Sequence, residues 1–158
     1  LLSGLRLMQT SLGTSWTGIP SAADDLFYPS ISFVGGEAGA SMMLLLSGSI
    51  SPGKRGHSVL IQFQLVELVM SFEEFSYLGS AQTDNRPENV INLINNSTTL
   101  DEARARTDKQ YLKHMLLTGN SCCEIVCHPD FDVKVFPDHS TALDFIAKDY
   151  LDQASSFR

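Results

Sequence analysis

The sequence has few basic residues and no long apolar run. Its 158 residues include 11 Lys and Arg against 18 Asp and Glu, for a formal net charge of -7. A surface of this sign repels polyphosphate, so we expect no nucleic-acid partner. The most apolar segment, Met42–Ile50, is far shorter than the roughly 20 residues that a membrane helix needs, and Ser47 and Gly48 interrupt it. We therefore expect a soluble chain with no membrane span.

Cysteine is also scarce, and its placement argues against a disulfide framework. Cys122, Cys123 and Cys127 are the three cysteines of the chain, and they lie close together instead of closing long loops. In a strand, Cys123 and Cys127 would face one side and Cys122 the other, as small apolar core residues. The odd number favours a reducing intracellular or organellar compartment. Because the sequence begins with leucine, we expect a processed product or a part of a longer chain.

The motifs that mark common catalytic and cofactor sites are missing. Gly35–Gly39 follows a predicted strand without the GxGxxG pattern, and no GxSxG elbow accompanies His57 and Ser58. The HExxH and CxxC spacings are absent as well. We expect no cofactor, and the sequence favours a protein that is not an enzyme.

What is present is the composition of a packed globular domain, with 43% apolar and 18% charged residues. Residues 1–29 are rich in Ser, Gly and Thr and predict an irregular N-terminal arm, followed by a single α+β domain over residues 30–158. The arm carries too many apolar side chains for a solvated tail, so we expect it to pack either on its own domain or on a neighbouring protein, and the second option would give it a binding function. The predicted partner-binding residues are Leu5, Leu7, Leu12, Trp16 and Phe27.

The first half of the domain shows the alternation of strands. Ser30–Val34 and Met42–Ile50 predict two strands, and a turn at 51–56 followed by period-two alternation from Val59 to Leu65 predicts a hairpin. Residues 65–78 fit either a strand or a helix, and we expect a strand to about Met70.

The second half turns to helical signals. We expect a short helix near 87–94 and a longer one over 100–118, begun by a capping box from Thr99 to Glu102 and ended by Gly119. Strands at 124–127 and 132–136 precede a closing helix capped by Ser140, with its apolar side inward. The fold expected is α+β, an antiparallel sheet of about four to five strands with two or three helices packed on one face. The inward residues of the closing helix would be Leu143, Ile146 and Tyr150.

Metal-binding side chains gather after the strand at 124–127. Imidazole and carboxylate together bind zinc or iron, and a metal-bound water is a hydrolytic nucleophile. His128, Asp130 and Asp132 are the candidate metal ligands, with Cys127 beside them and Asp138 or His139 as proton carrier. The interpretation that we favour over a metal site is an ordinary turn, which collects His, Pro and Asp for backbone reasons.

Two segments resemble known families. Glu124–Pro129, with Arg158 thirty residues after His128, is similar to the late His-Pro motif of carbohydrate deacetylases of the YdjC type. That family also has an early aspartate pair, which Asp24-Asp25 resembles, and a central His-rich metal motif, which is absent. A second set of segments is similar in order and spacing to the first half of rod-shaped plant virus coat proteins, without a counterpart to its second half. These segments are Phe75–Ala81, Ile91–Leu93, Ala105–Thr107 and Pro129–Val135.

Neither resemblance covers enough of the chain to assign a family. We expect a non-enzymatic structural or interaction subunit of a larger assembly, which binds other subunits or a second copy of itself through the arm and the sheet. The alternative is a small metal-dependent hydrolase with its site at the His128-Pro129-Asp130 turn. A ligand pocket between sheet and helices is a third possibility, which the sequence neither favours nor excludes.

Overall fold

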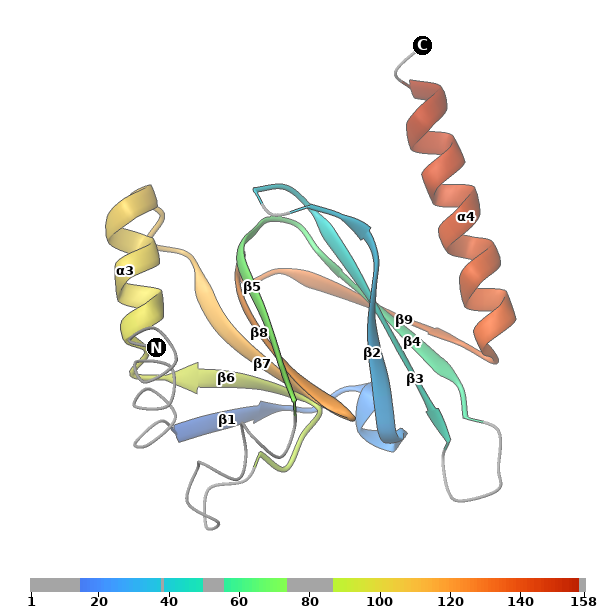
Figure 1. Cartoon of the computed structure of the whole chain (residues 1–158), viewed down its shortest axis with the longest axis horizontal. Helices are drawn as coiled ribbons and strands as arrows, with labels where there is room; N and C mark the ends of the chain where they lie inside the picture. The colour runs from blue at the N-terminus through green and yellow to red at the C-terminus, as the bar shows by residue number, and fades with distance from the viewer. Residues whose placement is uncertain (1–14, 38, 50–55, 74–86, 157–158) are drawn as a thin grey trace.

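The computed structural model describes residues 15–37, 39–49, 56–73 and 87–156, in which nine strands form two antiparallel sheets (Figure 1). The five-stranded sheet has the order β1-β6-β7-β8-β5, and the four-stranded sheet has the order β2-β3-β4-β9. The first sheet contains β1 (Ser15–Ile19), β5 (Val66–Glu73), β6 (Ile91–Asn95), β7 (Lys113–Thr118) and β8 (Ser121–Cys127). The second contains β2 (Phe27–Gly36), β3 (Met42–Ser49), β4 (Ser58–Phe63) and β9 (Phe131–Phe136).

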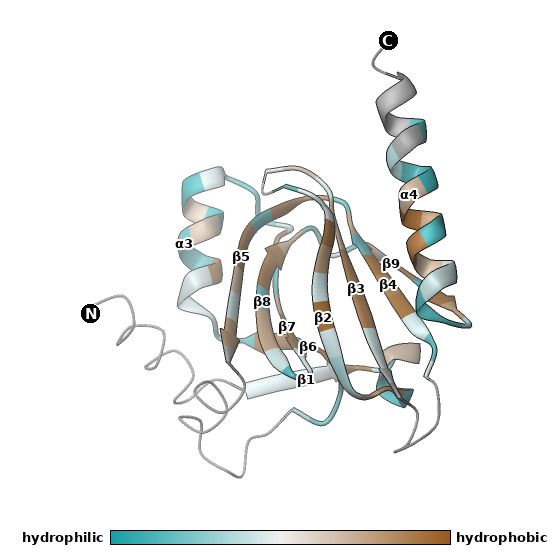
Figure 2. Ribbon diagram, turned by 45° about the vertical axis from the view of Figure 1, so that its right-hand side comes forward, coloured by the Kyte–Doolittle hydropathy of each residue, from teal (hydrophilic) through white to brown (hydrophobic). Residues whose placement is uncertain are grey.

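The two sheets enclose the main core, because each strand sends alternate side chains to the same side. In β4, Val59, Ile61 and Phe63 join a cluster that also takes in Cys123 and Cys127 of β8. Cys122 belongs to a different cluster on the other face of its sheet, so the predicted division of the cysteines is confirmed. Figure 2 shows apolar residues along the strands of both sheets, among them β3, β4, β5 and β8.

One ribbon of two paired strands passes through both sheets. β4 leads into β5 through Gln64 and Leu65, while β8 leads into β9 through residues 128–130. β4 pairs with β9 in one sheet and β5 pairs with β8 in the other. The amide of His128 donates to the Leu65 carbonyl at 2.8 Å and joins the two corners. The predicted pairing of β3 with β4 is confirmed. The strand expected to about Met70 is also found, but it extends to Glu73 and is a separate strand, β5, in the other sheet.

Each helix covers the outer side of a different sheet. Helix α3 buries Leu100 and Ala103 against the five-stranded sheet, and helix α4 buries Ala142 and Ile146 against the four-stranded sheet. The expected antiparallel pairing and mixed composition are confirmed, but the expectation of one sheet with helices on one face is wrong. Neither helix of the described chain is long and apolar enough to cross a membrane. The bounds are Thr98–Thr107 for α3 and His139–Ser156 for α4.

One predicted helix is absent, and a second is shorter than expected. The helix expected near 87–94 is instead β6, and the helix expected over 100–118 ends at Thr107, after which β7 follows. The cap of α3 is Ser97, whose hydroxyl accepts from the Leu100 amide at 3.0 Å, and not Thr99. Gly119 lies in the turn between β7 and β8 instead of ending a helix. The apolar residues of β7 are buried on both faces, which erases the alternation that marks a strand.

The orientation of α4 and the structure of the arm also differ from expectation. Ile146 faces inward as predicted, but Leu143 and Tyr150 are exposed, and the Asp138 carboxylate accepts from the Thr141 amide in place of a Ser140 cap. Residues 15–29 were expected to be irregular, yet they hold β1, the short 3-10 helix η1 (Ala22–Asp25) and the start of β2. Residues 1–14 lie outside the described part of the chain.

Candidate functional site

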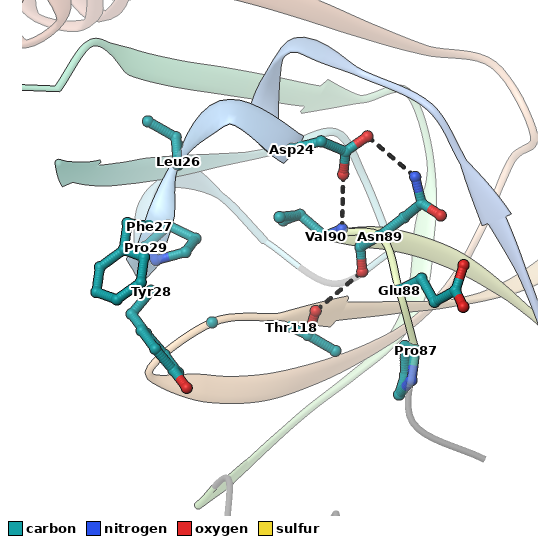
Figure 3. Close-up of a pocket in the computed structure, with 11 residues that line it drawn as sticks. Asp24, Leu26, Phe27, Tyr28, Pro29, Pro87, Glu88, Asn89, Val90 and Thr118 are labelled. Atoms are coloured by element: carbon teal, nitrogen blue, oxygen red, sulfur yellow. Dashed lines mark hydrogen bonds between the residues drawn. The ribbon is translucent and has the colours of Figure 1, made fainter. Parts of the chain in front are cut away.

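A pocket of about 270 Å³ opens at one end of the two sheets (Figure 3). It is built from three segments that are far apart in the sequence: residues 24–29 from η1 into β2, residues 87–90 before β6, and residues 118–119 after β7. The pocket therefore lies where the edge strand of one sheet meets two neighbouring strands of the other. Such a junction brings side chains from both sheets to one opening.

The Asp24 carboxylate joins the first two of these segments. One oxygen accepts from the Val90 amide at 2.8 Å, and the other accepts from the Asn89 side-chain amide and the Ser21 amide, both at 3.0 Å. The Ser21 hydroxyl in turn accepts from the Ala23 amide, which completes a capping box at the start of η1. Three donors on one carboxylate hold this wall of the pocket in place.

The turn between β7 and β8 forms the floor. The Thr118 hydroxyl donates to the Asn89 carbonyl at 3.0 Å, and the Asn120 amide donates to the Pro29 carbonyl at 2.9 Å. Between them, Gly119 packs so closely on β2 that a Cβ atom would lie 2.2 Å from the Pro29 carbonyl oxygen. Only glycine fits this approach, so the turn and the start of β2 are held at a fixed separation.

Two aromatic side chains form the rim opposite Asn89 and Val90 (Figure 3). Phe27 is 49% exposed and Tyr28 is 57% exposed, and their rings meet edge to face with centroids 4.8 Å apart. Tyr28 has a φ of 44°, and the register with β3 shifts between Phe27 and Ser30. A positive φ is strained for a bulky residue, and such strain is concentrated at functional positions.

The predicted partner-binding residues have different places in the structure. Phe27 lies on the rim of the pocket, whereas Trp16 lies in β1 and packs beside Ile94 and Leu116. Leu5, Leu7 and Leu12 lie outside the described residues. Tyr28 was missed by the sequence reasoning, although two adjacent aromatic residues before Pro29 were a visible signal.

The proposed metal ligands are not gathered into one site. His128 Nδ1 accepts a hydrogen bond from the Asp130 amide at 3.1 Å and lies 3.9 Å from the Asp130 carboxylate. The His128 ring lies beside the Tyr111 ring. Asp132 lies along β9 opposite Gln62. Across the described ranges, no group of three or more His, Cys, Asp or Glu residues has an arrangement that could hold a metal ion. The interactions of His128 and Asp130 are those of the corner turn.

The two residues considered as proton carriers take part in local structure. His139 Nδ1 lies 2.9 Å from the Ser47 hydroxyl, which in turn lies 3.0 Å from the Ser58 hydroxyl. The Asp138 carboxylate accepts from both the amide and the hydroxyl of Thr141 at the start of α4. The His139 contact attaches the start of α4 to the four-stranded sheet, and the Asp138 contacts join that start to the first turn of the helix.

A serine, a histidine and a carboxylate meet under α3, but solvent does not reach them. The Ser97 hydroxyl lies 2.6 Å from His114 Nδ1, and His114 Nε2 lies 3.2 Å from the Glu124 carboxylate. Their exposed fractions are 4%, 2% and 6%. The Ser97 oxygen already accepts from the Leu100 amide, so its remaining capacity is used by the histidine. The group is arranged as a buried anchor for α3, since a catalytic serine must meet its substrate.

The cysteines are equally inaccessible. Burial raises the pKa of Cys123 from 9.0 to about 12, with the neighbouring Glu124 carboxylate as a second cause, and burial raises the pKa of Cys127 from 9.0 to about 12. Thiols with such values carry almost no thiolate at neutral pH, and the thiolate is the nucleophile. Cys123 and Cys127 are therefore core residues and not candidates for covalent catalysis.

We expect the free energy of unfolding to fall as the pH rises from 9.0 towards 12, by about 1.4 kcal/mol per pH unit for each of the two thiols. The unfolded chain loses these protons first, so alkaline pH favours it, whereas below 9.0 both states keep them and the contribution is constant. Urea unfolding at a series of pH values measures the slope. The double variant Cys123→Ala, Cys127→Ala should show a shallower slope, and equal slopes would contradict the assignment.

The pocket remains the best candidate site, because it combines an opening to solvent with exposed aromatic residues and a rigid wall. Its polar groups are hydrogen-bonded to one another, and its rim exposes the apolar rings of Phe27 and Tyr28 to solvent. These are properties of a binding site. No family model, no curated protein and no solved structure matches this chain.

Proposed function

We propose that this chain is a non-enzymatic interaction subunit, which binds a partner protein at the pocket behind Phe27 and Tyr28. The observation that carries the proposal is the pair of half-exposed rings on the pocket rim, one of them held at a positive φ. A contiguous patch of exposed apolar side chains is a typical mark of an interaction site on a protein surface. Aromatic residues also supply a large share of the binding energy at protein interfaces.

The surroundings of the rings support binding more than chemistry. Asp24, which would be the natural proton acceptor in the pocket, already accepts three hydrogen bonds that hold the wall together. Ser97, His114 and Glu124 lie close together, but they are buried under α3. A rigid wall facing an exposed aromatic rim is instead a preorganised surface, which lowers the entropic cost of association.

The rings are held in place by interactions that leave them free for a partner. The close approach of Gly119 to Pro29 and the bond from Asn120 to the Pro29 carbonyl fix the backbone directly after Tyr28. The two ring planes are almost perpendicular, at 89°. The rim therefore presents a defined shape to the partner before binding.

In the double variant Phe27→Ala, Tyr28→Ala, we expect the free energy of partner binding to weaken by about 2 kcal/mol or more, which lowers the affinity roughly 30-fold. Affinity capture from the natural source with the native chain, followed by quantification of stoichiometric partners, measures the effect. The partners captured by the native chain should be absent or strongly depleted with the double variant.

Phe33→Ala is the matched control, because Phe33 is also on β2 and is 48% exposed, yet it does not line the pocket. This variant should capture the same partners as the native chain. Equal capture by all three proteins would contradict the proposal, and so would a native chain that travels alone. Circular dichroism of each variant verifies that the fold is intact.

A further inference from the structure

The described residues that line the pocket carry charge of one sign. Asp24 and Glu88 are acidic, and none of these described lining residues is Lys, Arg or His. Asp24 is held by three neutral N–H donors, which leave its negative charge in place. Within the described parts of the chain, neither carboxylate has a basic partner. A ligand of opposite charge would therefore be attracted to this opening.

The aromatic rim adds a second element of selectivity. Phe27 and Tyr28 form one side of the opening, with Asp24 above and Glu88 at the outer edge of the opposite side (Figure 3). Rings and carboxylates together bind a cation that has an apolar or planar body, since the ring faces carry partial negative charge. A planar guanidinium also stacks on aromatic rings and donates several hydrogen bonds to oxygen acceptors.

The size of the pocket indicates a single side chain. Its volume of about 270 Å³ lies just below the range of roughly 300 to 1,000 Å³ that is typical of sites for whole small molecules. We infer that the pocket recognises a guanidinium group, namely an arginine side chain presented by the partner protein. This inference rests on the proposed function and adds the chemical class of the group that enters the site.

The experiment compares N-acetyl-arginine amide with N-acetyl-citrulline amide, which has nearly the same shape without the charge. Each is titrated into the full chain while amide NMR signals are followed. We expect the arginine compound to bind with a Kd in the millimolar range, because it supplies a single side chain. The citrulline compound should bind at least tenfold more weakly, because it lacks the charge-assisted contact. The shifts should fall on Glu88, Asn89, Val90 and Gly119.

Two charge variants test the role of the pocket carboxylate. Glu88→Gln should weaken arginine binding by about threefold to tenfold, and Asp132→Asn, which removes one exposed negative charge on β9, should leave it unchanged. Equal binding of the two compounds, shifts outside the pocket, or no binding of the arginine compound would overturn the inference.

The same measurements separate this inference from the proposed function. If arginine fails to bind while the Phe27→Ala, Tyr28→Ala variant still loses its partners, the site is a docking surface of different chemistry. If arginine binds at the pocket while partner capture is unaffected by that variant, the guanidinium specificity is supported and the proposed docking function is wrong.

Discussion

Replacing His114 with alanine should lower the free energy of unfolding by about 3 kcal/mol. The imidazole lies 2.6 Å from the Ser97 hydroxyl and 3.2 Å from the Glu124 carboxylate, in a region where all three side chains are almost completely buried. Its removal takes a partner from each of two buried polar groups and leaves a cavity between α3 and the sheet. Urea unfolding at neutral pH measures the change.

Lys113→Ala is the control, since Lys113 is the exposed neighbour of His114 on β7. It should change stability by no more than about 0.5 kcal/mol. The stability of Ser97→Ala should lie between those of His114→Ala and Lys113→Ala, because this change removes the cap of α3 together with one contact of the histidine. A His114→Ala protein as stable as Lys113→Ala would show that the buried group does not anchor α3.

Replacing Gly119 with alanine should also cost about 3 kcal/mol, at the upper end of the usual range for overpacking. The added methyl group would lie 2.2 Å from the carbonyl oxygen of Pro29, which is a backbone atom held in β2. Neither partner can rotate away, so β2 and the turn after β7 must separate. We expect a lower urea midpoint and, because Tyr28 precedes Pro29, weaker binding of the partner or of the arginine compound.

Asn120→Ala is the corresponding control, because its exposed side chain lies in the same turn while its amide bond to Pro29 is kept. Its stability should stay within about 0.5 kcal/mol of the native chain. If Gly119→Ala is as stable as Asn120→Ala, the turn tolerates a wider separation from β2, and the inference that the floor of the pocket is rigid is wrong.

The sequence predicted β4 but failed at β6 and β7, although all three strands are buried on both faces. In β4 the turn at 51–56 and the polar Gln62 within the apolar run indicated a strand, and its pairing with β3 is confirmed. In β6, Ile91 and Ile94 are both buried but belong to clusters on opposite faces, and their spacing imitates one face of a helix. β7 has four consecutive buried residues, which fit a helix as well as a strand.

The candidate site could be predicted only in part, because it is assembled from three distant segments. Phe27 was identified as an exposed apolar residue, but for its place in an arm and not for a pocket. Nothing local indicates that Asn89 and Thr118 would meet at the end of the five-stranded sheet, since that contact depends on the pairing of β6 with β7. The positive φ of Tyr28 is likewise imposed by the surrounding structure, against the preference of the residue.

The ribbon that passes through both sheets has a consequence for synthesis of the chain. β4 and β5 are made early, but β8 follows β5 only after 47 residues (74–120) and β9 follows β4 only after 67 residues (64–130). When the first half of the chain has been translated, β4 and β5 therefore each have an edge without its pairing strand, β9 and β8 respectively. The nascent chain must keep these edges from pairing with other polypeptides until its last third emerges, so slowed elongation in this interval would favour aggregation.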